Sequence, residues 1–218
     1  MARAAGIGIR GGGLGSRVTD PRDDRIRCPW ATSGSESDRL LMCGYHDHEW
    51  GRPLRGRVAM FERMTLEAFQ SGLSWLVILR KRDNFRRAFA GFDIETVAGY
   101  TERDVARLMA DAGIVRNRAK IEAAIANARA AASLDVDLSE LLWSYAPPPR
   151  RRPATSAEVP PQTPESAALA HELKRRGFRF VGPTTAYALM QATGMVDDHL
   201  RDCWVSGSLT GGDAGKEQ

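Results

Sequence analysis

Apolar residues recur at intervals of three and four positions along much of this chain, which is the spacing of one buried face on an α-helix. The pattern predicts a helix over residues 58–71 and a second helix that begins after Ser74, a residue type that caps helix N-termini. The predicted buried positions are Met60, Phe61, Met64, Leu66, Phe69, Trp75, Ile78, Leu79, Phe85 and Phe89. We find no convincing alternation of apolar and polar positions of the kind that marks a half-buried strand, so we expect an all-α fold.

Capping residues place three further helical segments. Asp93 is expected to cap a short turn, and residues 101–104 resemble a capping box that precedes new apolar positions. Asn117 opens an alanine-rich segment, and alanine is the strongest helix former. A short helix is predicted over residues 138–145.

Loops and helix breakers divide the rest of the chain. Residues 33–38 are polar and are expected to form a loop, and the proline- and arginine-rich residues 147–153 are expected to form a stiff, basic connector. A helix is predicted from Pro164 to Gly177, because proline is favoured at helix starts and glycine at helix ends.

The next segment, residues 180–186, is typical of the turn in a helix-hairpin-helix. Gly182 is expected to allow a tight turn, and Pro183 and Thr184 are expected to open the following helix. Backbone N–H groups at such a helix start can bind a phosphate. The alternative is a pair of ordinary packed helices.

Composition limits the class of protein more than it specifies the function. The 218 residues are enough for one domain or two small ones, and 43% are hydrophobic. The net charge of +4 permits a polyanionic partner without requiring one. No apolar run approaches the roughly 18 residues of a membrane span, so we expect no membrane association. The 3 cysteines are odd in number and widely spaced, which favours a reducing cytoplasm over a disulfide framework.

The two ends of the chain differ in character from its centre. Residues 1–26 are rich in glycine and arginine and have no periodicity, so we expect a disordered tail or a start codon placed too early. Residues 206–218 are expected to form a second disordered tail. The folded domain is therefore assigned to residues 27–205.

Cysteine and histidine residues near both ends of the domain suggest a metal site. Zinc in structural sites is held by four nitrogen or sulfur ligands. Cys28 and His46 could combine with His199 and Cys203, whose spacing would place both side chains on one face of a helix. Two alternatives remain open on spacing alone. One is that no metal binds, and the other is a local site made of Cys28, Cys43, His46 and His48.

A further candidate site lies around Glu67, which is inside an apolar helical segment and precedes Trp75. Burying a carboxylate costs free energy unless the group is paired or has a function. Glu67 could instead point outward. In the functional interpretation, Tyr45 and Trp75 stack on a flat ring while Glu67 forms a hydrogen bond to its edge.

These segments together resemble the 3-methyladenine DNA glycosylase I family, within the helix-hairpin-helix glycosylases. The similarity extends over residues 27–205. The matching segments are Arg-Cys-Pro-Trp30, Tyr-His-Asp-His-Glu-Trp-Gly51, Leu-Glu-Ala-Phe-Gln-Ser-Gly-Leu-Ser-Trp75, Ala-Gly-Ile-Val-Arg-Asn-Arg-Ala-Lys-Ile121, Lys-Arg-Arg-Gly-Phe-Arg-Phe-Val-Gly182 and Val-Asp-Asp-His199 with Cys203. Departures from the family are a longer loop between Cys28 and His46, the pair Met42 and Cys43, and Asp197 in place of the more frequent Asn.

The resemblance implies a role for each matching position. It implies one structural zinc per chain, a base pocket and a surface that binds DNA. The implied zinc ligands are Cys28, His46, His199 and Cys203. The implied pocket residues are Glu67, Tyr45, Trp75 and the nearby Trp30. The implied catalytic carboxylates are Glu67 and Asp197, the latter because the wider superfamily carries its catalytic aspartate at that place. Leu73 is similar in place to a residue that fills the gap left by a flipped base. The other implied DNA contacts are Gly182, Thr184 and Lys174, with Arg116, Arg118, Lys120, Arg175 and Arg176 as further candidates for phosphates.

The implied activity is the release of 3-methyladenine from alkylated double-stranded DNA by a monomeric, monofunctional glycosylase of base excision repair. No lysine is placed beside Asp197 as a Schiff-base nucleophile would be, so we expect no lyase step. Two other functions are open. A DNA-binding module with structural zinc would not need a buried Glu67, and a zinc hydrolase would need an open position on the metal.

Overall fold

The computed structural model describes residues 23–205, and every element of regular secondary structure in this range is a helix. This confirms the all-α prediction for that part. The α-helices are α1 (Glu36–His48), α2 (Arg57–Gln70), α3 (Trp75–Ala88), α4 (Ile94–Ala98), α5 (Glu102–Ala110), α6 (Arg118–Ala132), α7 (Leu138–Trp143), α8 (Pro164–Arg175) and α9 (Pro183–Ala192), and the short 3-10 helices are η1 (Pro29–Ala31), η2 (Ala90–Phe92) and η3 (Ser156–Glu158). No helix in this range is both long and apolar enough to cross a membrane.

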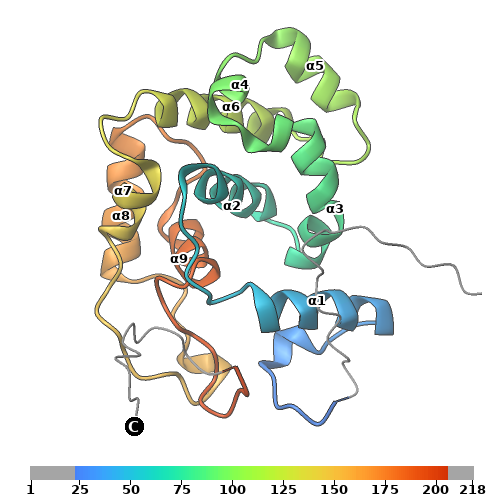
Figure 1. Ribbon diagram of the computed structural model, residues 1–218, viewed down its shortest axis with the longest axis vertical. Helices are drawn as coiled ribbons and strands as arrows, with labels where there is room; N and C mark the ends of the chain where they lie inside the picture. The colour runs from blue at the N-terminus through green and yellow to red at the C-terminus, as the bar shows by residue number, and fades with distance from the viewer. Residues whose placement is uncertain (1–22, 206–218) are drawn as a thin grey trace, which may run out of the picture.

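Helix α2 lies at the centre of the molecule, and α3, α6, α7 and α9 pack against it (Figure 1). The apolar positions predicted for this helix are buried, and Phe61, Leu66 and Phe69 have no exposed surface. Burial of such side chains contributes about 1.5–3 kcal/mol each, which makes α2 the main anchor of the core. One consequence is that Glu67, on the same helix, is carried into the interior.

Three predicted caps are confirmed, whereas Ser74 stands at the N-cap of α3 without a side-chain cap hydrogen bond. The Asp93 side chain accepts a hydrogen bond from the Thr96 N–H, and the Asn117 side chain accepts one from the Lys120 N–H. Thr101 and Asp104 form the predicted capping box. Together these caps define α4, α5 and α6, which lie at the end of the molecule opposite α1 (Figure 1).

The polar segment 33–38 is not a loop throughout, as the sequence suggested. Helix α1 begins at Glu36, because the Ser35 side chain accepts a hydrogen bond from the Asp38 N–H and satisfies one of the free donors at the helix start. This helix carries Tyr45 and His46, which are both buried, toward the centre of the molecule.

Segments from the two ends of the domain lie side by side below α1 and α9 (Figure 1). The Trp204 N–H donates to the Ile26 carbonyl at 2.8 Å, and Arg27 forms ion pairs with Asp23 and the buried Asp47. Residues 23–26, which the sequence assigned to an N-terminal tail, therefore contact the domain. The predictions for residues 1–22 and 206–218 fall outside the described range.

Candidate functional site

A cavity of about 340 Å³ opens between α1, α2, α3 and α9, and its lining includes the aromatic side chains of Trp30, Tyr45, Trp50 and Trp75. Helix α1 contributes Tyr45, α2 contributes Glu67 and Gln70, and α3 contributes Trp75. The remaining lining residues come from both ends of the domain and from the connector before α8, and include Trp30, Trp50, Ser156, Val159, Gln191, Asp198 and Leu200. The volume and the aromatic walls suit a flat ring of nucleobase size.

Tyr45 and Trp75 form one aromatic wall of this cavity, as predicted. Their ring centroids lie 5.2 Å apart with the planes inclined at 41°, and the ring centroid of Trp30 lies 6.3 Å from that of Tyr45. The Tyr45 hydroxyl accepts a hydrogen bond of 2.6 Å from Arg63, which fixes the tilt of the ring. The indole N–H of Trp75 is buried without an acceptor in the described structure, so a polar ligand atom could receive it.

Glu67 is the buried carboxylate of the cavity. It is only 5% exposed, which rules out the alternative that it points into solvent. Burial raises the pKa of Glu67 to about 7, and the positive charge of Arg63 offsets part of that rise. Among residues 23–205 its carboxylate has no hydrogen-bond partner, and it lines the cavity. A buried acceptor without a donor is poised to bind a ligand that brings one.

Asp198 is a second buried carboxylate in the cavity wall, and the sequence analysis missed it. It accepts hydrogen bonds from the Tyr187 hydroxyl at 2.5 Å and from Gln191 at 2.8 Å, and it pairs with Arg150 at 2.6 Å. The pair Asp197-Asp198 was visible in the sequence, but the donors that select Asp198 come from α9 and from the connector before α8. Only the fold brings them together.

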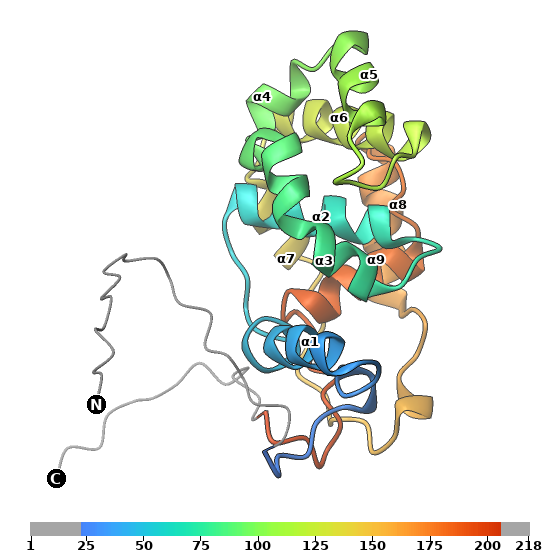
Figure 2. The ribbon, with the colours of Figure 1, turned by 90° about the vertical axis from the view of Figure 1, so that its right-hand side faces the viewer.

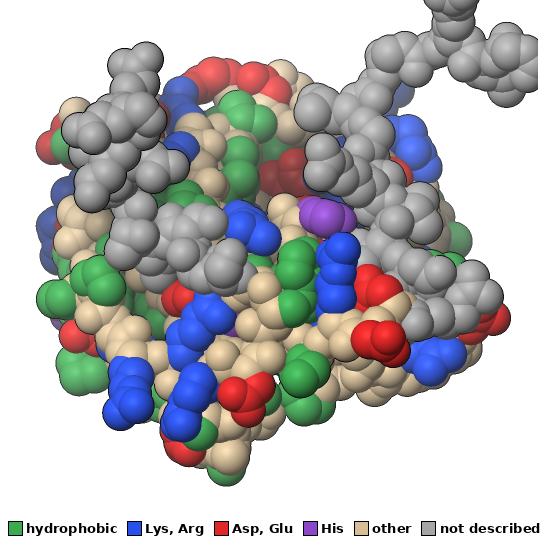
Figure 3. Space-filling view, turned by 60° about the horizontal axis from the view of Figure 1, so that its bottom comes forward, with side chains coloured by type: hydrophobic (Ala, Val, Ile, Leu, Met, Phe, Trp, Pro, Cys, Tyr) green, Lys and Arg blue, Asp and Glu red, His purple; other side chains and the backbone are tan. Residues whose placement is uncertain are grey.

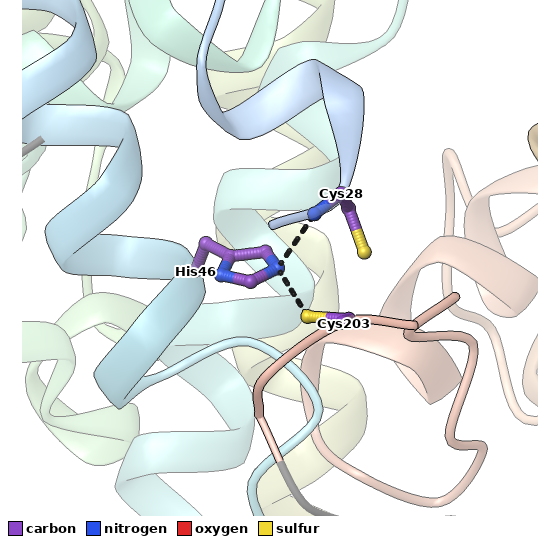
Figure 4. A group of neighbouring side chains, drawn as sticks. All are labelled: Cys28, His46 and Cys203. Carbon is purple, nitrogen blue, oxygen red and sulfur yellow. Dashed lines mark hydrogen bonds between the residues drawn. The ribbon is translucent and has the colours of Figure 1, made fainter. Parts of the chain in front are cut away.

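Three of the four predicted metal ligands form a buried cluster that joins the chain ends (Figure 4). The ligand atoms of Cys28, His46 and Cys203 all lie within 4.8 Å of one another, and Cys203 Sγ is 3.5 Å from His46 Nε2. A hydrogen bond between the two thiols lowers the pKa of Cys203 to about 4 and raises that of Cys28. Deprotonated sulfur and a neutral imidazole are the donor types that zinc prefers.

His199, the fourth predicted ligand, lies beside this cluster. Its ring centroid is 5.0 Å from that of His46, and its buried Nε2 has no hydrogen-bond partner in residues 23–205. The predicted helix through His199 and Cys203 is wrong, because residues 197–200 have no regular structure and a turn at residues 201–202 precedes Cys203. The ligand atoms that lie within 4.8 Å of one another belong to Cys28, His46 and Cys203 alone, so His199 remains a predicted ligand beside a cluster of three.

Carboxylates orient both histidine rings. Asp47 Oδ1 lies 2.8 Å from His46 Nδ1, and Asp197 Oδ1 lies 2.9 Å from His199 Nδ1. Such contacts hold a ring so that Nε2 is directed toward a metal. Asp197 also pairs with Arg152 at 2.7 Å, and it is absent from the cavity lining within the described range.

The alternative local metal site does not form. Its second cysteine, Cys43, donates its thiol to the Ala31 carbonyl at 3.3 Å, away from the cluster. Its second histidine, His48, is exposed at the end of α1. The helical period of α1 explains the result, because His46 and His48 are separated by about 200° around the helix.

The loop between α2 and α3 presents Leu73 to solvent next to the cavity. Leu73 is 38% exposed, and Gln70 and Trp75, at the two ends of the loop, line the cavity. Gly72 has φ +80°, a backbone conformation that favours glycine. Lys120, proposed above as a phosphate contact, is instead buried beneath the loop and donates to the carbonyls of Phe69 and Ser71.

Helices α8 and α9 pack against each other across the turn that contains Gly182. Contrary to expectation, Gly182 does not make the turn, since its φ of −68° suits any residue. Positive φ occurs at Gly177 and Phe180 instead. A Cβ added at Gly182 would meet nothing within 4 Å, so the space above it is open to an external group.

Other predicted phosphate contacts divide into free and paired groups. Thr184 and Lys174 are exposed at the start of α9 and near the end of α8. Arg118 instead pairs with Glu102 and Glu122. Arg175 and Arg176 both pair with Glu172, which reduces the charge that they can offer to DNA.

Comparison with known proteins places the chain in a family. The family model described as methyladenine glycosylase matches residues 34–206. The chain is 43% identical over 182 residues to the DNA-3-methyladenine glycosylase 1 of Escherichia coli K12, covering 81% of this chain and 95% of the relative. It is 40% identical over 185 residues to the DNA-3-methyladenine glycosylase of Haemophilus influenzae, covering 81% of this chain and 96% of the relative.

A solved structure supports the same assignment. The structure of 3-methyladenine DNA glycosylase I from Staphylococcus aureus, which addresses 3-methyladenine recognition, aligns with a TM-score of 0.76 at 33% identity. The alignment covers 82% of this chain and 95% of that chain. The sequence and fold comparisons therefore agree, and the chain belongs to the methyladenine glycosylase family.

Proposed function

We propose that this protein is a monofunctional DNA glycosylase that flips 3-methyladenine out of alkylated double-stranded DNA and hydrolyses its N-glycosidic bond. The observation that carries the proposal is the buried, unpartnered carboxylate of Glu67 in a cavity walled by Tyr45 and Trp75. The relatives named above are glycosylases for this base. A protein that only binds DNA would have no use for such a pocket.

The chemistry of the substrate suits this pocket. Methylation at N3 makes the base cationic and weakens its bond to the sugar, so the base departs as a neutral molecule without a strong general acid. Electron-rich aromatic faces attract a cationic ring, and Tyr45 and Trp75 provide such faces. Glu67 in its ionised form accepts a hydrogen bond from the amino group of the base, and water then attacks the sugar.

We also propose that Cys28, His46, His199 and Cys203 hold one structural zinc ion. The unpartnered Nε2 of His199 and the carboxylates behind both histidines support this assignment. A bound zinc would supply folding free energy by joining the two ends of the domain. Four protein ligands would occupy every coordination position of the zinc. A zinc hydrolase needs one position open for water, so this alternative is disfavoured.

The DNA-binding surface is proposed to include the Leu73 loop and a helix-hairpin-helix formed by α8 and α9. Leu73 would fill the gap left by the flipped base, while Gly182, Thr184 and Lys174 would contact phosphates. The exposure of these positions and the open space above Gly182 support the assignment. We further propose a monomer that acts in the reducing cytoplasm, in keeping with its 3 free cysteines.

Chromatography of bases released from a methylated duplex tests the proposal directly. The wild-type protein should release 3-methyladenine, and Glu67→Gln should release it more slowly while retaining duplex binding. Release of no base by the intact, metal-loaded protein would favour the alternative of a DNA-binding module. Including 3-methylguanine among the measured products would also define the substrate range.

A further inference from the structure

A second cavity, of about 280 Å³, lies in the connector between α7 and α8 and is lined mainly by arginine. The arginine run that the sequence places in this connector contributes three of its side chains. The complete lining is Arg150, Arg151, Arg152, Pro153, Glu158 and Arg201. The functional assignments above leave this cavity without a role.

Two of these arginines are held in place by buried carboxylates. Arg150 pairs with Asp198 at 2.6 Å, and the Nε of Arg152 pairs with Asp197 at 2.7 Å. The second terminal nitrogen of Arg152, Nη2, is buried and has no hydrogen-bond partner in the described structure. A buried charged donor without an acceptor is costly, so this nitrogen is prepared for an external anion.

The other two arginines bring positive charge that no carboxylate neutralises. Arg151 and Arg201 are both exposed, and neither forms an ion pair within residues 23–205. The only acidic side chain in the lining, Glu158, is directed toward its own segment, where it accepts from the Ala154 N–H at 2.9 Å. The Arg201 N–H donates to the Pro153 carbonyl at 2.9 Å, which joins the two segments that form the cavity.

The arginine cavity lies next to the proposed base pocket. Asp198 lines the base pocket and also anchors Arg150, and Ser156 and Val159 of the same connector line that pocket. The connector helix η3 projects from the same edge of the molecule as the α2–α3 loop (Figure 2). Figure 3 views the end of the molecule that contains the connector, where Lys and Arg side chains are exposed among Asp and Glu side chains.

From this arrangement we propose that Arg151, Arg152 and Arg201 bind a backbone phosphate of the DNA strand that carries the extruded nucleotide. The inference rests on the proposed glycosylase function. Guanidinium groups match phosphate with paired, parallel hydrogen bonds, and such contacts position a protein on DNA without reading sequence. The wall shared by the two cavities would hold the base on one side and the phosphate on the other.

The salt dependence of duplex binding tests this phosphate contact. We would compare the double variant Arg151→Gln/Arg201→Gln with the wild type on a duplex that contains a stable abasic-site analogue. The logarithm of the binding constant falls with the logarithm of salt concentration by about 0.9 per phosphate contacted. The variant should therefore show a slope smaller by about 0.9 and weaker binding at low salt.

A matched control removes the same charge elsewhere. Arg87 on α3 and Arg103 on α5 are exposed and form no carboxylate ion pair in the described range, so Arg87→Gln/Arg103→Gln should keep the wild-type slope. Equal slopes for the wild type and the connector variant would overturn the proposal. An equal loss of slope in the control would also overturn it, because the effect would then reflect net charge alone.

A second arm separates a DNA phosphate from a free anion. Isothermal titration of the wild type with inorganic phosphate should show at most weak binding, since a DNA contact draws affinity from the rest of the duplex. Tight binding of phosphate that Arg151→Gln/Arg201→Gln abolishes, with the duplex slope unchanged, would assign the cavity to a free anion and overturn the proposal. Base release by the wild type reports separately on the proposed function.

Discussion

Glu67 and Asp197 occupy different environments, and their substitution should have different effects. Glu67 lines the cavity without a partner, whereas Asp197 is engaged by His199 and Arg152. A hydrogen bond to a charged group is worth about 1.5–3 kcal/mol. We therefore expect Glu67→Gln to slow 3-methyladenine release by roughly ten- to a hundredfold and Asp197→Asn by less than about tenfold.

Single-turnover base release would measure both variants. The zinc content of Asp197→Asn must be checked, because Asp197 contacts a proposed metal ligand. A larger loss in Asp197→Asn with zinc intact would reverse the assigned roles, and Asp197 would then serve as the catalytic carboxylate.

The burial of Glu67 also predicts a dependence of stability on pH. Its pKa is raised from about 4.5 in the unfolded chain to about 7 in the folded protein, so the folded state binds more protons between these values. The stability contributed by the protonated form is present below pH 4.5 and is lost as pH rises through 7. The Glu67→Gln variant cannot ionise at this position, so its folding stability does not fall from this cause over this pH range.

Glu67→Gln should therefore gain stability relative to the wild type as the pH rises. Between about pH 5 and about pH 8 we expect the difference in unfolding free energy to grow by up to about 3 kcal/mol. Urea denaturation of both proteins across this range is the measurement. A difference that stays constant with pH would show that Glu67 keeps an ordinary pKa, despite its burial beside Arg63.

At the scale of single residues, the pattern alone left open whether Glu67 points outward. The pocket roles of Tyr45, Glu67 and Trp75 were predicted from the resemblance to a known family, and the structure places all three in the lining of one cavity. Asp198 could not be predicted, since its partners Tyr187 and Arg150 are far from one another in the sequence. A carboxylate flanked by a second carboxylate gives no local signal of which one will face a cavity.

Among the elements, the α2–α3 loop depends on a single buried cation. Lys120 of α6 donates to the Phe69 carbonyl at 2.8 Å and to the Ser71 carbonyl at 2.5 Å, and burial lowers its pKa. A cation at the end of α2 also interacts favourably with the helix dipole. Lys120 is therefore expected to hold the loop that presents Leu73.

Lys120→Met should weaken base release from duplex DNA by roughly tenfold, because loss of these bonds at ~1.5–3 kcal/mol would loosen the loop. Binding of free 3-methyladenine, followed by tryptophan fluorescence, should change little, since the pocket walls remain. Arg129→Met is the control, because Arg129 lies on the same helix and donates to the carbonyls of Ala98 and Tyr100. Equal losses in both variants would indicate a general effect on α6.

Element prediction succeeded where either apolar periodicity or a capping residue gave a clear signal. Helices α2 and α3 show apolar periodicity without a side-chain cap, and the Asn117 side chain caps the alanine-rich α6. Helix α1 is more polar, and its start at Glu36 depends on one side-chain cap, so the segment resembled a loop. The helix expected at His199 failed because spacing was the only argument for it.

At the scale of the molecule, the contacts of residues 23–26 define how much of the N-terminus the domain needs. Deleting residues 1–22, which lack periodicity, should leave stability and base release nearly unchanged. Extending the deletion to residue 26 removes the Asp23 partner of Arg27 and the carbonyl that receives the Trp204 N–H. Thermal denaturation should then show a loss of roughly 1 kcal/mol or more.

The comparison of the two deletions is the test of this boundary. If removal of residues 1–22 alone costs as much as the longer deletion, the N-terminal segment packs on the domain and the expected tail does not exist. If neither deletion changes stability, the contacts around Trp204 contribute little.

The proposed zinc site connects the two ends of the domain, and its loss should therefore affect the whole molecule. We expect one tightly held zinc per chain and a large fall in thermal stability in Cys203→Ser, because a structural zinc contributes folding free energy. Pocket chemistry should change less than stability, measured at a temperature where the variant remains folded. Cys43→Ser is the matched control, since Cys43 is buried but lies outside the cluster.

Metal analysis of a double variant would decide which ligands hold the ion. Zinc should be absent after His199→Ala and Cys203→Ser together, which remove both ligands from the C-terminal segment. Zinc retained in that variant would mean that the N-terminal residues bind it alone and that the chain ends meet without a shared metal. Retention by Cys43→Ser and loss by the double variant would assign the ion to the cluster of Cys28, His46, His199 and Cys203.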